Sequence, residues 1–221
     1  STYSLSNEKT TLDSFAAHEI TTFEVHRAIT NLPNKRSCGD DGITANEMKK
    51  FCEYLILPLT LIFNFSLSQG IFPLSLKYSR VVPIPKTSKP DSPVDYRPIS
   101  ILSTVSKVLE AILKKRMVNF LLKHSFFNNN QFGFLPRKST SEALVTHLNE
   151  IVNNLERSKT VFGLYLDLAK AFDTVNHDIL FEKLHRAGFR GDFHNWLKSY
   201  VQNRQQCVVY NGNRSEWRQV I

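Results

Sequence analysis

The sequence predicts an α+β fold that is rich in helices and has a small, mostly antiparallel sheet. Helices are indicated by polar capping residues that stand directly before apolar residues at helical spacing. Strands are indicated by short β-branched segments with prolines and by an Asn-Gly pair that favours a tight hairpin. With 221 residues, of which 42% are apolar, the chain can build one large domain or two small ones around a hydrophobic core.

The first 80 residues are expected to be mainly helical. Thr21 with Glu24, and Thr44 with Glu47, have the spacing of a capping box, in which each side chain satisfies a backbone N–H at the helix start. An apolar stripe at positions i, i+3, i+4 and i+7 follows each of them. The two stripes are Val25, Ala28, Ile29 and Leu32, and Met48, Phe51, Cys52 and Leu55.

Two further features complete this helical part. A third helix is expected from about residue 59 to 68, with Gly70 in the left-handed position that ends it. A polar loop at 33–42 separates the first two helices and contains Gly-Asp-Asp-Gly at 39–42. We interpret this tetrapeptide as a turn and not as a catalytic motif, because it stands in a loop between helices.

From residue 80 the pattern changes to extended segments. Residues 80–86 are β-branched and interrupted by prolines, which favours an edge strand or an extended segment, and 96–102 is a second such segment. A long amphipathic helix is expected at about 103–123 and a loop at 128–138. Ser139 with Glu142 then predicts another capped helix, with an apolar stripe of Leu144, Leu148, Ile151, Val152 and Leu155.

The segment 160–166 is apolar on both faces, which is typical of a strand buried in the middle of a sheet, and it ends at Asp167. Helices at about 178–187 and 192–203 follow. Asn176, His177 and Asp178 stand before the first of these and are interpreted as N-cap residues. The chain closes with a hairpin, because Asn211-Gly212 fits a type I′ turn.

The positive charge is unevenly distributed. Residues 1–60 contain 6 Lys+Arg and 8 Asp+Glu, so their net charge is −2. Since the whole chain has a net charge of +8, the remaining 161 residues have a net charge of +10. Such an excess favours a polyanionic partner, above all nucleic acid. Within it, the cluster Lys114-Lys115-Arg116 is equally compatible with a solvated helix face and with a contact to an RNA backbone.

Other classes are disfavoured by the sequence. Cys38, Cys52 and Cys207 are odd in number and far apart, which argues against a disulfide scaffold or a zinc ribbon and favours an intracellular, reducing compartment. The first ten residues lack the pattern of a signal peptide. The most apolar stretch, 54–63, is too short to span a membrane, so we expect no membrane partner.

Asp167 is the sharpest candidate for chemistry. A carboxylate at the end of a buried strand is rigidly placed to bind a divalent cation. Asp173, six residues on, would be too far away to share the metal, so a second carboxylate must come from elsewhere. Taken alone the pattern is weak: Asp167 could equally cap the next turn, and receiver domains or phosphatases also carry such an aspartate. We interpret Asp173 as structural.

Four segments in order are more specific. They are RVVPIPK, then VDYRPISILSTVSKVLE, then NNQFGFLPRKSTSEALV, then YLDLAKAFDTVNHDIL. In this order and at these intervals the chain resembles the reverse transcriptase domain of non-LTR (LINE-type) retrotransposons over about residues 20–221. The upstream NKRSCGDDGITANEMKK is similar to the N-terminal extension of that group.

The resemblance implies a right-hand polymerase, with residues 1–79 as the helical extension of the fingers and 80–221 as the fingers and an incomplete palm. It implies an Mg²⁺-dependent RNA-directed DNA polymerase that joins a dNTP to a primer 3′-hydroxyl on an RNA template. Asp167 would be the catalytic metal ligand, and the carbonyl of Leu168 a further ligand. Lys86, Arg97 and Phe172 would bind the nucleotide, the ring of Phe172 excluding a ribose 2′-hydroxyl.

The resemblance also implies a template-side segment, where Gln131, Arg137 and Lys138 are weaker candidates. The family's next motif, Gly-x-Pro-Gln-Gly, is expected directly after residue 221, and the Ala-Asp-Asp motif lies beyond it. With one of the expected carboxylates, these residues alone cannot assemble a two-metal site. The alternative is therefore a catalytically incomplete nucleic-acid-binding remnant. Nuclear action is expected from the family alone.

Overall fold

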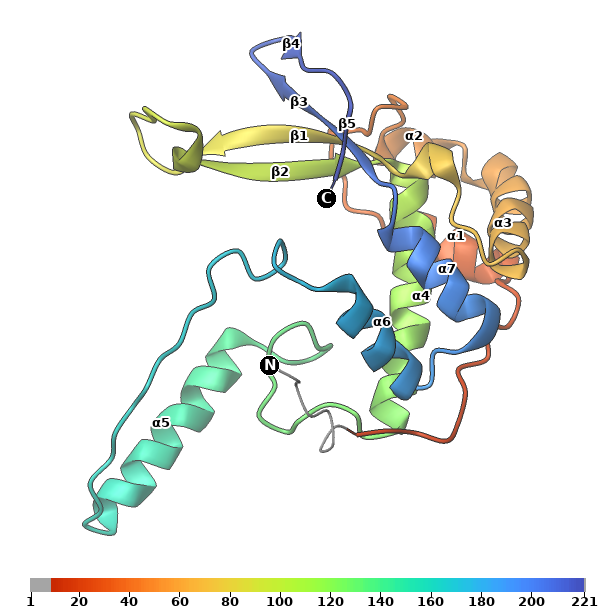
Figure 1. Ribbon diagram of the computed structural model, residues 1–221. Coiled ribbons are helices and arrows are strands. Elements are labelled where there is room, and N and C mark those ends of the chain that lie inside the picture. The colour runs from red at the N-terminus through yellow and green to blue at the C-terminus, as the bar shows by residue number, and fades with distance from the viewer. Residues whose placement is uncertain (1–8, 221) are drawn as a thin grey trace.

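The computed structural model describes residues 9–220 and has an α+β fold, as the sequence predicts. The helices are α1 (Thr22–Thr30), α2 (Ala45–Lys50), α3 (Cys52–Ser68), α4 (Thr104–Lys123), α5 (Thr140–Glu156), α6 (His177–Arg186) and α7 (Gly191–Val201). The strands are β1 (Tyr78–Pro85), β2 (Tyr96–Leu102), β3 (Gln205–Tyr210), β4 (Asn213–Arg214) and β5 (Arg218–Gln219). Figure 1 shows the sheet at one end of a group of helices, with α5 extending away from both.

The sheet is small and mostly antiparallel, with strand order β2-β1-β3-β4 and β5 also paired with β3. β1 pairs antiparallel with β2 over Ser79–Pro85 and parallel with β3 over Tyr78–Val81. The segment 80–86 is extended, as predicted, and from Val82 onward it lies at an edge of the sheet, whereas Arg80 and Val81 are covered by β3. Pro83 and Pro85 are tolerated because they lie beyond the part of β1 that β3 covers, where one side of the strand is free.

The local signals for the starts of α1, α2 and α6 are confirmed. Thr21 and Thr44 each accept a hydrogen bond from the backbone N–H three residues on, and Glu24 and Glu47 complete the two capping boxes. Asn176 caps α6 by accepting from the N–H of Ile179. These signals act over one turn of chain, so they do not depend on the rest of the fold.

Two predicted helices are differently divided in the structure. The helix expected to carry the stripe from Met48 to Leu55 ends at Lys50 with Phe51 as its C-cap, and α3 begins at Cys52, so the third helix starts well before residue 59. Pro58 lies inside α3, where the apolar faces packed into the core offset its missing N–H. Phe51, expected in the core, is about half exposed because it stands at this break.

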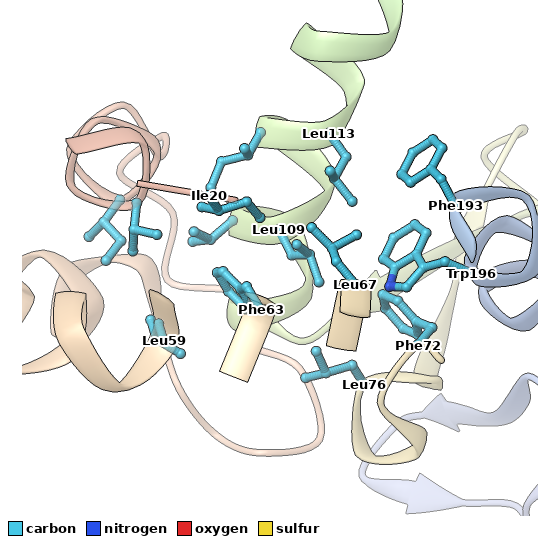
Figure 2. Close-up of a cluster of buried hydrophobic side chains, with 14 of the residues drawn as sticks. Ile20, Leu59, Phe63, Leu67, Phe72, Leu76, Leu109, Leu113, Phe193 and Trp196 are labelled. Carbon is cyan, nitrogen blue, oxygen red and sulfur yellow. The ribbon is translucent and has the colours of Figure 1, made fainter. Parts of the chain in front are cut away.

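The core lies between α1, α3, α4 and α7, and Figure 2 shows how its side chains meet. Phe63 of α3, Leu109 of α4 and Trp196 of α7 are buried in one cluster. The indole N–H of Trp196 donates to the Ser66 hydroxyl at 2.9 Å, so the polar atom of this buried ring is satisfied. The core includes residues from both sides of position 79. The predicted division of the chain into a helical extension, 1–79, and the fingers and partial palm, 80–221, stays a prediction.

The segment 160–166 is not the buried strand that its apolar residues predict. It has no strand structure, and Phe162 and Leu166 are 92% and 84% exposed. Among the described residues no strand pairs with it, and a strand needs such a partner to satisfy its backbone. Its side-chain contact with α5 is a hydrogen bond between Tyr165 Oη and His147 Nε2, which are 2.9 Å apart.

Helix α5 starts where expected but packs differently. Ser139 caps it, whereas the Glu142 carboxylate accepts from Lys138 at 2.7 Å and does not close a capping box. No described residue of α5 is buried, and the apolar stripe along it stays about half exposed. The stripe therefore contacts no core among residues 9–220.

The loop at 39–42 is a turn, as predicted. Gly42 has φ of +70° and donates its N–H to the carbonyl of Gly39. Asp40 forms an ion pair with Arg214 at 2.9 Å. Its carboxylate is thus part of a contact between the loop and the C-terminal hairpin, which is a structural role.

The hairpin turn at Asn211-Gly212 is confirmed, with φ of +48° and +77° as a type I′ turn requires. All three cysteines are free. In the described part of the chain no helix has both the length and the apolar character needed to cross a bilayer. The N-terminal residues 1–8, where a signal peptide was not expected, and residue 221, next to which the following motif was expected, lie outside the described residues.

Candidate functional site

Lys86 and Arg97 lie at the open end of the β1–β2 ribbon. Arg97 stands opposite Ile84, and the ribbon continues one step further, where the N–H of Lys86 donates to the carbonyl of Asp95 at 2.7 Å. Since side chains alternate along a strand, Lys86 and Arg97 project from the same face. Both are exposed, and Lys86 Nζ donates to the carbonyl of Val94. Two cations on one face of an extended ribbon can bind an anionic group such as a phosphate.

Asp167 stands in the extended segment between α5 and α6. It is exposed, as is Leu168 after it, and neither lies at the edge of a sheet in the described structure. A turn follows, closed by the N–H of Asp173, which donates to the carbonyl of Lys170 at 2.9 Å. Lys170 has φ of +50°. The turn directs the chain from Asp167 toward α6.

Phe172 lies in this turn and contacts the predicted template-side loop. Its ring packs edge-to-face against Phe134, with centroids 6.0 Å apart and an angle of 89° between the rings. Phe134 adopts φ of +63°, and both rings are largely exposed. The structure therefore brings two of the predicted motifs together through one aromatic pair, which motif order alone does not predict.

The remaining template-side candidates are exposed or half-buried around that loop. The Gln131 side-chain amide donates to the carbonyl of Gly133 at 3.3 Å. Lys138 lies 5.0 Å over the ring of Phe132 and pairs with Glu142. Arg137 is exposed with φ of +60°. Among these three, the Arg137 side chain has no hydrogen bond or ion pair within residues 9–220.

The described residues do not form a complete metal site. No group of three His, Cys, Asp or Glu side chains gathers anywhere within residues 9–220, so Asp167 is not part of such a group. A two-metal centre needs several oxygen ligands around each ion. The donor set present is thus too small for Mg²⁺ to be held by this part of the chain alone.

One predicted cationic cluster is split in the structure. Of Lys114, Lys115 and Arg116, the two lysines are exposed, whereas Arg116 forms a partly buried ion pair with Glu24. Arg116 therefore has a structural role, which the sequence could not indicate because its partner is 92 residues away. Sequence reasoning also missed the packing of Tyr96 against Tyr210, whose hydroxyls are 3.2 Å apart.

Comparison with known proteins gives one family match. The family model described as "Reverse transcriptase (RNA-dependent DNA polymerase)" matches residues 84–220. This range includes every residue that the resemblance assigns to the nucleotide, the metal or the template.

Curated relatives match more of the chain. The "Probable RNA-directed DNA polymerase from transposon BS" of Drosophila melanogaster is 33% identical over 186 residues, which are 84% of this chain and 20% of that protein. The "RNA-directed DNA polymerase from mobile element jockey" of the same organism is 30% identical, over 89% of this chain and 21% of that protein. The chain thus spans about a fifth of the length of these relatives.

Proposed function

Because this chain belongs to the reverse transcriptase family of non-LTR retrotransposons, we propose that it forms the fingers and the first part of the palm of an RNA-directed DNA polymerase. The observation that carries the proposal is the family match over residues 84–220. The position of Lys86 and Arg97 on one face of the β1–β2 ribbon supports it, as does the contact between Phe134 and Phe172.

In this proposal the cations of the ribbon bind the triphosphate of an incoming dNTP. The guanidinium of Arg97 offers paired N–H donors and Lys86 a point charge. Phe172 places an aromatic ring beside the sugar and excludes a ribose 2′-hydroxyl. The Phe134 ring limits the positions that Phe172 can take, which links nucleotide choice to the template-side loop of Gln131, Arg137 and Lys138.

Reverse transcriptases use Mg²⁺, and we infer that Asp167 and the carbonyl of Leu168 supply part of its coordination. The other carboxylates would come from outside residues 9–220. Docking of the remaining palm against 160–166 would give this apolar segment the strand partner that it lacks here. The RNA template and DNA primer would lie between the fingers and that completed palm.

The decisive experiment joins this chain to the C-terminal part of the palm of a relative and measures Mg²⁺-dependent dNTP incorporation on an RNA template with a DNA primer. Asp167→Asn is expected to reduce the rate by on the order of 10²–10³-fold, because it removes charge from the reacting centre. Asp173→Asn is the matched control, since Asp173 lies six residues on, and it is expected to retain activity. Incorporation that survives Asp167→Asn would overturn the assignment.

A second function is favoured by the incomplete donor set around Asp167. In that case the chain binds nucleic acid and does not polymerise. Salt-dependent binding of a primer–template duplex by the 221-residue chain, together with no incorporation by the joined protein, would support this alternative and contradict the polymerase.

A further inference from the structure

A groove runs along α4, and none of the residues proposed to bind the nucleotide, the metal or the template lines it. It consists of two adjoining cavities of about 700 Å³ and 670 Å³, and Arg116 and Asn119 line both of them. The first cavity lies between α1 and α4, and the second between residues 13–18 and the C-terminal half of α4. We call the two together the α4 groove.

The α4 groove has more cations than its own carboxylates can neutralise. Its two carboxylates are engaged: Glu24 pairs with Arg116 at 2.6 Å, and Asp13 lies 3.6 Å from His124. Four further cations line the groove, and their side chains form no ion pair or hydrogen bond with any residue in the described range 9–220. These are Arg27, Lys107, Lys115 and Lys123.

The spacing of these cations favours a long polyanion over a small anion. Lys107, Lys115 and Lys123 follow one another at intervals of eight residues along α4, each about 80° around the helix axis from the one before. Lys107 and Lys115 line the first cavity and Lys123 lines the second. At about 1.5 Å per residue, successive lysines are separated by about 12 Å along the axis. A single phosphate or carboxylate cannot bridge such distances, whereas a strand with a charge at every residue that winds along the groove can reach from one lysine to the next.

The other lining groups indicate contacts to a backbone and not to bases. The amides of Asn31 and Asn119 are exposed in the groove and can bond to phosphate or sugar oxygens. Stacking of bases would need large exposed aromatic faces, but Phe120 is half-buried and packed against Phe15 and Phe189, and the exposed ring in the groove is the small imidazole of His18. We propose that the α4 groove binds the phosphodiester backbone of a nucleic-acid strand without reading its sequence.

A binding assay on the full chain tests the charge requirement. The probe is a fluorescein-labelled uridine oligonucleotide of about 20 residues, long enough to cover the groove. Arg27→Gln with Lys115→Gln removes two exposed cations of the groove, and Lys50→Gln with Lys114→Gln removes two exposed cations outside it, one of them on the same helix. The groove variant is expected to bind at least about tenfold more weakly at about 50 mM KCl, and the control variant within about twofold of the wild type.

The salt dependence gives a second measure of the same contacts. Each lost phosphate contact lowers the slope of log K against log [KCl] by about 0.7 for a single strand, so the groove variant should lose about 1.4. A thymidine oligonucleotide of the same length should behave alike if the backbone alone is bound, and RNA-selective binding would point to the 2′-hydroxyl. An equal loss of oligonucleotide affinity in the groove variant and the control variant would overturn the proposal. Tighter binding of polyglutamate than of RNA by the wild-type chain would also overturn it.

Lysine acetylation of the wild-type chain locates the contact without any substitution. Bound oligonucleotide is expected to protect Lys115 and Lys123 from acetylation, measured by mass spectrometry, while Lys114 and Lys50 stay reactive. Equal reactivity of Lys114 and Lys115 would contradict the groove. The variant Asp167→Asn should show the same protection as the wild type, so a failure of the polymerase proposal and a failure of this one are distinguishable.

Discussion

Arg116 of α4 donates hydrogen bonds to both carboxylate oxygens of Glu24 in α1, at 2.8 Å from Nε to Oε1 and 2.6 Å from Nη2 to Oε2. The same guanidinium donates to the carbonyls of His18 and Glu19. Glu24 also accepts the N–H of Thr21 in the capping box. One carboxylate thus closes the start of α1 and fastens that helix to α4, along one wall of the α4 groove.

Arg116→Ala is expected to lower the free energy of unfolding by about 2–3 kcal/mol. Removal of one partner from a buried ion pair costs more, but here the side chains are 18% and 31% exposed and water replaces part of the interaction. Urea denaturation followed by circular dichroism measures the change. Lys114→Ala, an exposed site two residues away, should stay within about 0.5 kcal/mol of the wild type.

The contribution of this pair should depend on pH in one direction. The Arg116 hydrogen bond holds the pKa of Glu24 below its ordinary value of 4.5. The charged carboxylate therefore stabilises the fold fully above about pH 4.5, and this stabilisation is lost as the pH falls through the lower native pKa. The difference in unfolding free energy between wild type and Arg116→Ala should shrink below pH 4.5. A difference that stays constant down to about pH 3 would contradict this linkage.

Gly39→Ala is expected to destabilise the protein by about 2 kcal/mol. A Cβ at Gly39 would lie 2.6 Å from Cα and 2.7 Å from N of Ser103, the residue that caps α4. These are backbone atoms, so relief requires a shift of the loop or of the helix start. Gly133→Ala is the control, because no atom lies within 4 Å of its Cβ position. Thermal unfolding of both variants tests the contrast, and equal melting temperatures would contradict it.

The elements predicted correctly are those whose cause lies within a few residues. The capping of α1 and α2 by Thr21 and Thr44 and the turn at Asn211-Gly212 depend on local hydrogen bonds and on φ. The pairing of the first part of β1 with β3 involves residues more than 120 positions away, so the prolines of the segment could not indicate it.

The sequence likewise predicts some features of the candidate site and not others. Motif order makes Lys86, Arg97, Asp167 and Phe172 candidates, which stays a prediction, but it could not show that Phe172 packs on Phe134. The buried strand expected at 160–166 was inferred from apolar residues on both faces, which predicts burial only when partners are present to cover them.

Thiol reactivity should separate the three cysteines. Cys52 and Cys207 are buried, and burial raises the pKa of the Cys52 thiol, which lowers its thiolate fraction. Cys38 is partly exposed and lies beside the guanidinium of Arg80. Reaction with an aromatic disulfide reagent should label one thiol rapidly in the native protein and three in guanidinium chloride. Cys38→Ser should abolish the rapid phase, and two or more rapid thiols in the wild type would contradict the packing.

Tyr200 of α7 should make the protein less stable at alkaline pH. Desolvation, followed by the nearby charge of Glu110, raises the pKa of Tyr200 from 10.0 to about 12. Because the native state favours the neutral phenol, its stabilisation is fully present below about pH 10 and is lost as the pH rises toward 12. The difference in unfolding free energy between wild type and Tyr200→Phe should therefore fall by about 1.5 kcal/mol between about pH 10 and 11.5. Urea denaturation at each pH measures it. Parallel stability curves for the two proteins over that interval would show that the Tyr200 phenol is solvated in the native state.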